Sequence, residues 1–245
     1  MASLFQPIIP NKPGKPTAWA GLRGPSLALA LANAALRENQ LFFVITDDAR
    51  HAVKLEEELK FFLGNNGHEV AIFPDWETLP YDVFSPLPEL ISERLSILNK
   101  VSSLNRGIIL CSTANLIQKI CPKVFVNAHS FELSIGQKIN FNEFLKKIEQ
   151  AGYRAVSQVF SHGEFAVRGA LIDIFPMGAN DPIRIDLFDD EIESIRVFSA
   201  DTQLTKNKIS EFSILPANEF PLDSKSITNF RKNWRGFFQA TQSKV

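Results

Sequence analysis

The residues with the clearest chemical potential lie in segment 21–28, which reads GLRGPSLA and precedes a stretch rich in Ala and Leu. A phosphate-binding P-loop uses backbone N–H groups to cradle the phosphates, a Lys for the β/γ charge and a Ser or Thr hydroxyl for Mg²⁺. The corresponding positions here are Gly21, Gly24, Ser26, Leu27 and Ala28. The lysine and the metal-binding hydroxyl are therefore missing, and Pro25 removes an N–H donor. The segment predicts a degenerate P-loop that does not hydrolyse ATP, although a helix start can still hold a sulfate.

Other groupings of reactive side chains do not form a catalytic or metal-binding pattern. The histidines lack the spacing of metal ligands and lie at His51, His68, His129 and His162. The consecutive acids at 189–191 favour a solvated turn over a metal site. Cys111 and Cys121 cannot build a disulfide framework or a four-ligand zinc site, and we interpret them as buried thiols in a reducing cytosol. The sequence therefore predicts no catalytic residue, no metal and no cofactor in this chain.

A binding surface is indicated by segment 183–188, which reads IRIDLF. Side chains of a β-strand alternate between its two faces. The three apolar residues then share one face, and Arg184, Asp186 and Phe188 point to the other. A Phe beside an Arg on a polar face has the composition of a protein-interface hot spot. Because single exposed apolar residues are common, an incidental surface stays open as the alternative.

The first half of the chain must supply the elements around the glycine loop. Between Pro16 and Pro122, short apolar runs alternate with helical patterns. Helices are predicted at 26–37, after a cap at Asp47 or Asp48, and around 91–98; strands are predicted at 41–46, 69–73 and 107–111. Short apolar strands separated by helices predict a parallel sheet of the α/β class.

The second half has a different pattern. A helix over about 142–151 precedes strand-like runs at 164–175, 183–188 and 191–198, with a hairpin turn at 189–190. These elements predict a small α+β domain that carries the IRIDLF strand. A further apolar stripe at helical spacing predicts a helix over 226–238.

Composition limits the class of protein. The chain has 245 residues, 45% hydrophobic and 22% charged, which predicts a globular protein of one or two domains. The net charge of −1 disfavours a dedicated nucleic-acid binder. No apolar run approaches the ~18 residues of a membrane span, and the first residues lack a signal-peptide core. We therefore expect a cytoplasmic protein with no membrane partner.

Longer motifs resemble DNA-repair proteins. The segments GEFAVRGALIDIFP (163–176) and FDDEIESIR (188–196) resemble the second domain of the excinuclease B protein (UvrB) of nucleotide excision repair. The segments DWETLPYD (75–82), ISERL (91–95) and LPANEFP (215–221) resemble the N-terminal region of the bacterial transcription-repair coupling factor (Mfd) family. The resemblance covers about 18–240.

The resemblance implies an architecture and a role. Residues 1–130 would form domain 1a, a degenerate nucleotide fold; 131–213 would form domain 2, an adaptor that docks the excinuclease A protein (UvrA); and 214–245 would begin domain 1b. The parent protein would be an ATP-driven DNA translocase acting on stalled RNA polymerase. Its motor, which binds ATP and Mg²⁺, and its contacts with polymerase and DNA would lie beyond residue 245.

Two departures from UvrB favour the coupling factor. UvrB has an intact P-loop, and it has a long DNA-gripping hairpin for which the link between Phe73 and Ile91 leaves no room. The resemblance implies that Arg168, Arg184 and Phe188 bind UvrA, the arginines by forked bonds to carboxylates and the ring by filling a pocket. In a continuous strand Arg168 would lie on the same face as the apolar Ile172. We therefore expect Gly169 to form a bulge that turns Arg168 outward.

The predicted function is a non-catalytic adaptor that recruits UvrA in transcription-coupled nucleotide excision repair. Two alternatives stay open. One is a nucleotide-dependent enzyme that uses the loop at Gly21, which Leu27 and Ala28 disfavour. The other is an intramolecular clamp that holds the parent translocase inactive.

Overall fold

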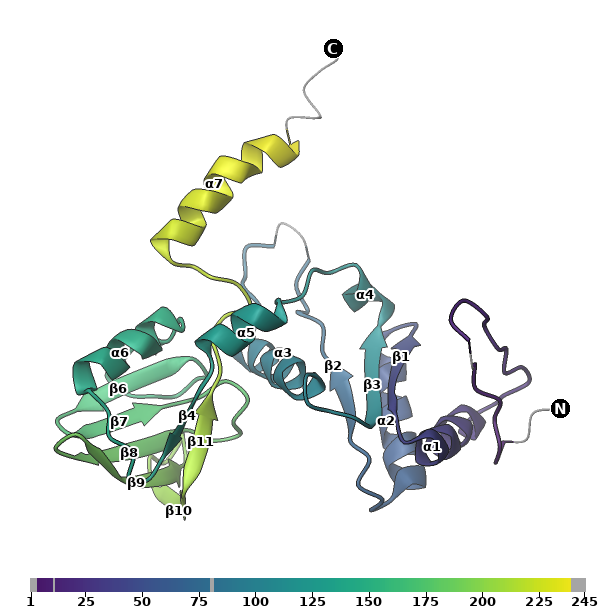
Figure 1. The fold of residues 1–245 in the computed structure, drawn as a ribbon, viewed down its shortest axis with the longest axis horizontal. Coiled ribbons are helices and arrows are strands. Elements are labelled where there is room, and N and C mark those ends of the chain that lie inside the picture. The colour runs from purple at the N-terminus through teal and green to yellow at the C-terminus, as the bar shows by residue number, and fades with distance from the viewer. Residues whose placement is uncertain (1–3, 11, 80–81, 239–245) are drawn as a thin grey trace, which may run out of the picture. The chain divides into compact units, whose positions relative to one another are not determined.

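The computed structural model describes residues 4–10, 12–79 and 82–238 (Figure 1). The described residues form two compact units. Unit 1 is drawn from 1–85 and 100–119, and unit 2 from 86–99 and 120–245. These limits differ from those of the predicted domains because most of helix α3 (Pro88–Val101) packs into the core of unit 2. The division into domains 1a, 2 and 1b stays a prediction.

Unit 1 contains a three-stranded parallel sheet in the order β1-β3-β2. Its strands are β1 (Leu41–Thr46), β2 (Val70–Phe73) and β3 (Gly107–Ser112). Its helices are α1 (Ser26–Glu38), α2 (Ala49–Leu63) and the short α4 (Thr113–Leu116). The predicted parallel strands and the alternation of helix and strand are confirmed.

Apolar side chains of α1 and α2 hold unit 1 together. Leu31 of α1 and Leu55 and Leu59 of α2 pack with Ile108 and Leu110 of the central strand. The first turn of α2 is capped by the Asp48 carboxylate, which accepts a 2.7 Å hydrogen bond from the backbone N–H of His51. Of the two predicted caps, Asp48 is therefore the one used.

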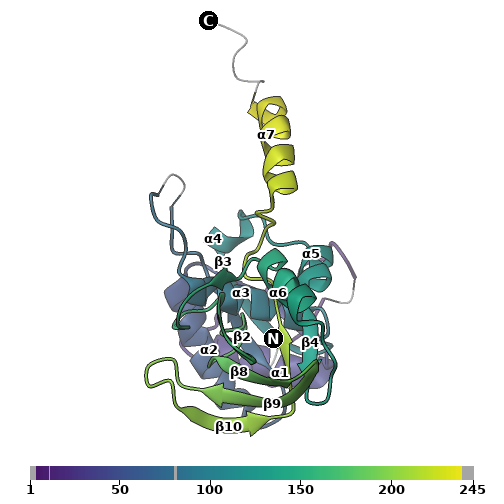
Figure 2. The same cartoon turned by 90° about the vertical axis from the view of Figure 1, so that its left-hand side faces the viewer.

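Unit 2 is built around a six-stranded sheet in the order β10-β9-β8-β7-β6-β5, part of which faces the viewer in Figure 2. The strands are β5 (Arg154–Ala155), β6 (Glu164–Arg168), β7 (Leu171–Ile174), β8 (Ile183–Phe188), β9 (Glu191–Phe198) and β10 (Thr205–Ile209). A second sheet pairs β4 (Phe131–Ser134) with β11 (Glu211–Ile214). The helices besides α3 are α5 (Lys123–His129), α6 (Phe141–Gln150) and α7 (Ser224–Phe238). Parallel and antiparallel sheets together confirm a mixed α/β fold.

The two faces of the six-stranded sheet are covered differently. On one face, Phe144 and Ile148 of α6 join the main core with Ile172, Ile185 and Ile195. On the other face a smaller apolar cluster consists of Val159, Ala166, Phe175 and Phe198. We call this second side the outer face. The apolar cluster lies at one end of the strands, so the rest of the outer face can present polar side chains.

The run predicted as one strand over 164–175 is a hairpin. Arg168 pairs with Leu171, which leaves Gly169 and Ala170 as a two-residue loop between β6 and β7. Gly169 has φ +63°, as the first central position of a type II′ turn requires. The expected bulge at Gly169 is therefore wrong, because a tight turn already supplies the positive φ.

No helix among the described residues is long and apolar enough to cross a membrane.

Candidate functional site

The outward residues of β8 are those that strand alternation predicts. The apolar residues 183, 185 and 187 belong to the main core. Arg184 and Asp186 are half-buried and Phe188 is exposed, all on the outer face. The predicted parity of this strand is confirmed.

Arg168 lies on the same face as Arg184 and Phe188. Through the sheet register, Arg168 stands opposite Leu171, and Leu171 stands opposite Asp186 of β8. With strands about 4.8 Å apart and a rise of about 3.3 Å per residue, the Cα of Arg168 lies roughly 10 Å across the sheet. Along the strand direction, this Cα lies halfway between the Cα atoms of Arg184 and Phe188, which are roughly 13 Å apart on β8. The structure thus brings the three sequence-predicted residues onto one surface.

The hairpin explains why Arg168 reaches this face. Because two residues form the turn, even-numbered residues of β6 share a face with odd-numbered residues of β7. Ile172 consequently points into the main core, and Arg168 points the other way. Its side chain is exposed, and Nη2 donates a 3.1 Å hydrogen bond to the backbone carbonyl of Ser157.

Arg184 is held by two neighbours on the outer face. Its Nε and Nη2 donate to the two carboxylate oxygens of Asp173 at 2.7 and 2.9 Å. Its guanidinium carbon lies 4.7 Å from the centre of the Phe198 ring, a distance at which a cation–π attraction operates. The hydrogen bonds that Arg184 donates to Asp173 raise the pKa of Arg184, although burial opposes the shift. The side chain is 19% exposed, so only part of it is accessible to a partner.

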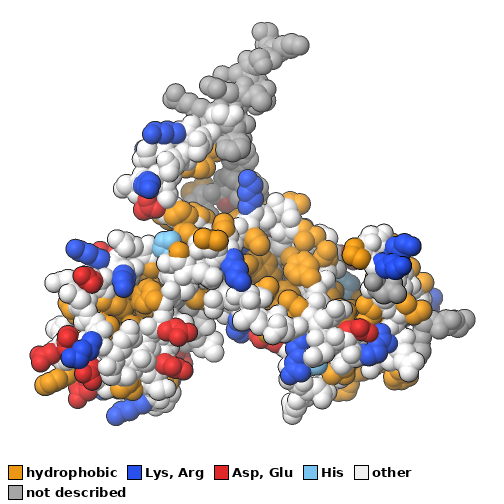
Figure 3. Space-filling model, viewed as in Figure 1, with side chains coloured by type: hydrophobic (Ala, Val, Ile, Leu, Met, Phe, Trp, Pro, Cys, Tyr) orange, Lys and Arg blue, Asp and Glu red, His pale blue; other side chains and the backbone are white. Residues whose placement is uncertain are grey.

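Phe188 ends β8 at the hairpin to β9, and 69% of it is exposed. A shallow cleft of about 330 Å³ beside the ring is lined by charged side chains, which are Lys138, Asp189, Asp190, Glu191 and Glu193. Acidic and basic side chains are interspersed on the face of unit 2 that Figure 3 shows. An exposed aromatic ring in charged surroundings is suited to filling an apolar pocket of a partner.

Sequence reasoning misses the residues that orient Arg184. Asp173 is 3% exposed and stands directly across the β7–β8 pair from Arg184, and the buried Phe198 lies under the guanidinium. One signal was available for Asp173, which is an acid inside the apolar run LIDIF of 171–175. A buried carboxylate needs a charged or hydrogen-bonding partner. No comparable signal marks Phe198, whose place depends on the sheet register.

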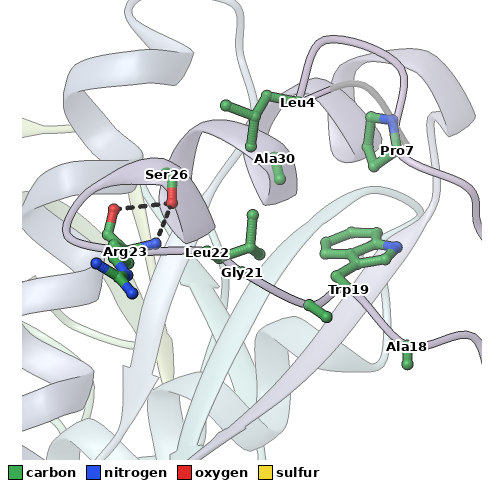
Figure 4. Close-up of a pocket in the computed structure, with 10 residues that line it drawn as sticks. Leu4, Pro7, Ala18, Trp19, Gly21, Leu22, Arg23, Ser26 and Ala30 are labelled. Carbon is green, nitrogen blue, oxygen red and sulfur yellow. Dashed lines mark hydrogen bonds between the residues drawn. The ribbon is translucent and has the colours of Figure 1, made fainter. Parts of the chain in front are cut away.

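The glycine loop of unit 1, residues 21–25, directly precedes α1 and lies beside a cavity of about 670 Å³ (Figure 4). Gly21 and Gly24 have φ of +77° and +54°. The Ser26 hydroxyl donates to the backbone carbonyl of Arg23 and accepts from its N–H, at 2.8 and 2.7 Å. Ala28 is buried in the core of unit 1, and Leu27 packs against that core. Leu27 and Ala28, which take the lysine and metal-ligand positions of the motif, are thus apolar and pack with the core of unit 1.

The cavity beside this loop has a largely apolar lining. Leu4, Trp19 and Ala30 surround it in Figure 4, where the guanidinium of Arg23 lies toward one edge. The Trp19 indole donates a 2.8 Å hydrogen bond to the carbonyl of Ile8. These residues offer little to bind a triphosphate.

Groups that could react covalently or hold a metal are also poorly suited. Within the described ranges, no cluster of three or more His, Cys, Asp or Glu side chains is placed to hold a metal ion. Both cysteines are buried. Burial, and secondarily the nearby charge of Glu219, raise the pKa of Cys121 to about 11, so its thiol is protonated at neutral pH and a poor nucleophile.

Part of unit 2 matches a known protein family. Residues 131–220 match the UvrB interaction domain family. This segment contains the whole six-stranded sheet and therefore Arg168, Arg184 and Phe188. The outer face thus lies within the residues that match the UvrB interaction domain family.

The whole chain matches longer proteins. It is 43% identical over 236 residues to the transcription-repair-coupling factor of Haemophilus influenzae, which covers 96% of this chain and 20% of that relative. It is 38% identical over 239 residues to the Escherichia coli transcription-repair-coupling factor, covering 98% of this chain and 21% of that relative. A Staphylococcus aureus transcription-repair-coupling factor is 30% identical over 229 residues, with 94% and 19% covered.

These matches support the interpretation of the chain as an N-terminal region of the transcription-repair-coupling factor family. The chain spans about a fifth of the length of these curated relatives.

Proposed function

We propose that this chain is a non-catalytic docking module that recruits the excinuclease protein UvrA in transcription-coupled nucleotide excision repair. The observation that carries the proposal is the common placement of Arg168, Arg184 and Phe188 on the outer face of the six-stranded sheet. The match of residues 131–220 to the UvrB interaction domain family also supports the proposal.

Each of the three residues has a distinct part in docking. Phe188 is the exposed apolar anchor, and Arg168 supplies an exposed cation whose Nη2 donates a hydrogen bond to the backbone carbonyl of Ser157. Arg184 contributes the part of its guanidinium that Asp173 leaves available. Aromatic and arginine side chains of this kind dominate the binding energy of protein interfaces.

The remaining functions are assigned to the parent protein. We infer that it is an ATP-dependent DNA translocase, whose ATP and Mg²⁺, RNA polymerase and DNA are bound outside this chain, in the cytoplasm. The loop at Gly21 serves as the start of α1 and takes no cofactor, because the side chains of Leu27 and Ala28 pack into the core. Unit 1 therefore acts as a scaffold.

Calorimetric titration of the chain with purified UvrA tests the proposal. Saturable binding is expected, and Phe188→Ala is expected to weaken it about 30-fold, as truncation of a hot-spot residue does. Phe61→Ala is the matched control, since Phe61 is 78% exposed but lies on α2 of unit 1. Absence of binding by a well-folded chain would contradict the proposal and favour an intramolecular clamp in the parent protein.

A further inference from the structure

We propose that Asp173 is a positioning residue of the docking surface, which fixes Arg184 so that only the outer edge of its guanidinium receives a partner carboxylate. The proposal rests on the proposed function and adds the chemistry by which the partner is recognised. It assigns a role to a buried residue that touches no partner itself.

The sheet and two hydrogen bonds fix the geometry of Asp173 and Arg184. Asp173 and Arg184 are directly opposite each other on neighbouring antiparallel strands, so both backbones are fixed by the sheet ladder. The carboxylate accepts one hydrogen bond on each oxygen, from Nε and from Nη2. A fork of two parallel hydrogen bonds sets both the position and the plane of a guanidinium.

An aromatic ring supports the plane of the Arg184 guanidinium. The Phe198 ring lies 4.7 Å from the guanidinium carbon, and Phe198 is fully buried in the small cluster of the outer face. A flat guanidinium between a carboxylate edge and an aromatic face loses little further freedom when it binds. Such preorganisation increases affinity by reducing the entropy lost on association.

On the β9 side of β8, Arg184 has a second arginine as its neighbour. Arg196 of β9 stands directly opposite Arg184, and like charges in that position repel. Arg196 is drawn instead to Asp186, with a 2.8 Å hydrogen bond from Nη2. The two arginines are therefore each paired with a different carboxylate, and Arg184 is directed towards β7.

The chemistry of the remaining edge follows from this arrangement. A guanidinium has five N–H donors, of which the fork with Asp173 uses one on Nε and one on Nη2. The other donors, on Nη1 and Nη2, suit a second carboxylate approaching end-on. Because Asp173 already neutralises the charge of Arg184, the contact of Arg184 with a partner carboxylate depends mainly on well-placed hydrogen bonds. The long-range attraction for the partner comes from Arg168.

A mutant cycle on binding to UvrA tests the inference. Asp173→Asn keeps the side-chain shape but puts an amide N–H₂ against an arginine N–H, so the fork cannot form. We expect it to weaken binding about tenfold through faster dissociation. In an Arg184→Gln background the same substitution should change the affinity less than about twofold, because no guanidinium remains to be positioned.

Asp186→Asn is the matched control. It removes the same charge from the same face and strand neighbourhood, but Asp186 pairs with Arg196 and not with Arg184. A loss of affinity below about threefold is expected for this variant. Equal losses for Asp173→Asn and Asp186→Asn, or an equal effect of Asp173→Asn in both backgrounds, would overturn the positioning role.

Further measurements separate positioning from folding. In ¹⁵N NMR spectra of the free chain, the Arg184 Nε–H signal should be protected from exchange in the wild type and lose that protection in Asp173→Asn. Should Asp173→Asn not fold, Phe198→Leu removes the supporting ring while keeping apolar volume, and unchanged partner affinity in that variant would contradict the inference. If the wild type binds UvrA, and Phe188→Ala loses that binding while Asp173→Asn keeps it, only the positioning role of Asp173 is overturned. If the wild type does not bind UvrA, the proposed function is overturned as well.

Discussion

Arg184 and Asp173 join neighbouring strands β7 and β8 through two hydrogen bonds of 2.7 and 2.9 Å, on the face of the sheet that also carries Phe188. The side chain of Asp173 is almost wholly buried, whereas that of Arg184 reaches solvent. The pair therefore belongs both to the stability of the sheet and to the surface offered to a partner. Substitutions of Arg184 affect both properties, and a binding experiment must separate them.

Arg184→Ala should destabilise unit 2 by about 3 kcal/mol, because it leaves the Asp173 carboxylate buried without its charged partner. Urea unfolding followed by circular dichroism measures the change. The double variant Arg184→Ala/Asp173→Ala should be less destabilised than the sum of the single variants, since it removes the unpaired charge. Additive losses would mean that the two side chains do not interact in solution.

Arg168→Ala should behave differently from Arg184→Ala. The Arg168 side chain is exposed and bonds within the chain to the Ser157 carbonyl, so stability should change by no more than about 0.5 kcal/mol. Binding to UvrA should fall about tenfold, with a weaker dependence on salt, because a surface cation is lost. Arg50→Ala, at an exposed position on α2 of unit 1, is the control and should bind as the wild type does.

Much of the outer face was predictable because strand alternation is a local property. The sequence IRIDLF assigns its apolar residues to the core, and the structure places Arg184 and Phe188 opposite them. The parallel sheet of unit 1 was predictable for a similar reason, since each short apolar run is separated from the next by a helical pattern.

Other features depend on pairings between distant residues. The orientation of Arg168 follows from a two-residue turn at Gly169, which reverses the parity that a continuous strand would have. The support of Arg184 by Phe198 depends on the register of β8 with β9, which a β-bulge between Asp186 and Leu187 shifts. Neither can be deduced from a single strand, because register is fixed only when both partners are known.

Addition of Mg²⁺ and ATP should not raise the melting temperature of the chain. A ligand at 100 times its dissociation constant would stabilise the folded state by about 2.7 kcal/mol, which thermal unfolding detects readily. The apolar packing of Leu27 and Ala28 offers neither a cation for the phosphates nor a ligand for the metal. A saturable increase with ATP would contradict this prediction and restore the nucleotide-dependent alternative.

Glu164 should make the stability of unit 2 depend on pH in the acidic range. Burial alone would raise its pKa, but hydrogen bonds from the backbone N–H groups of Phe160 and Ser161, together with Arg154, outweigh burial and lower the pKa below its ordinary value. The folded state then binds a proton less readily than the unfolded state. The stabilisation is present above the unfolded pKa of about 4.3 and is lost as the pH falls through the lower folded pKa.

Urea unfolding of the wild type and Glu164→Gln between about pH 6 and about pH 3 tests this dependence. The difference in unfolding free energy between the two proteins should shrink as the pH falls. A constant difference across the range would show that the carboxylate is not held in its charged form by these contacts.

Glu219→Gln should destabilise unit 2 by about 3–5 kcal/mol, because it removes the charged partner of a buried arginine. Arg94 of α3 is 0% exposed, and its Nε and Nη2 donate to the two carboxylate oxygens of Glu219, which follows β11 in the chain. The pair ties residues 125 positions apart in the sequence, within the motifs ISERL and LPANEFP. Replacing both side chains together, as Arg94→Met/Glu219→Leu, should cost less than Glu219→Gln because the buried guanidinium is removed together with the carboxylate that it bonds to. Chemical denaturation of the wild type, Glu219→Gln and the double variant measures these differences. A double variant less stable than Glu219→Gln would mean that the ion pair itself stabilises the packing of α3 beyond its apolar contacts.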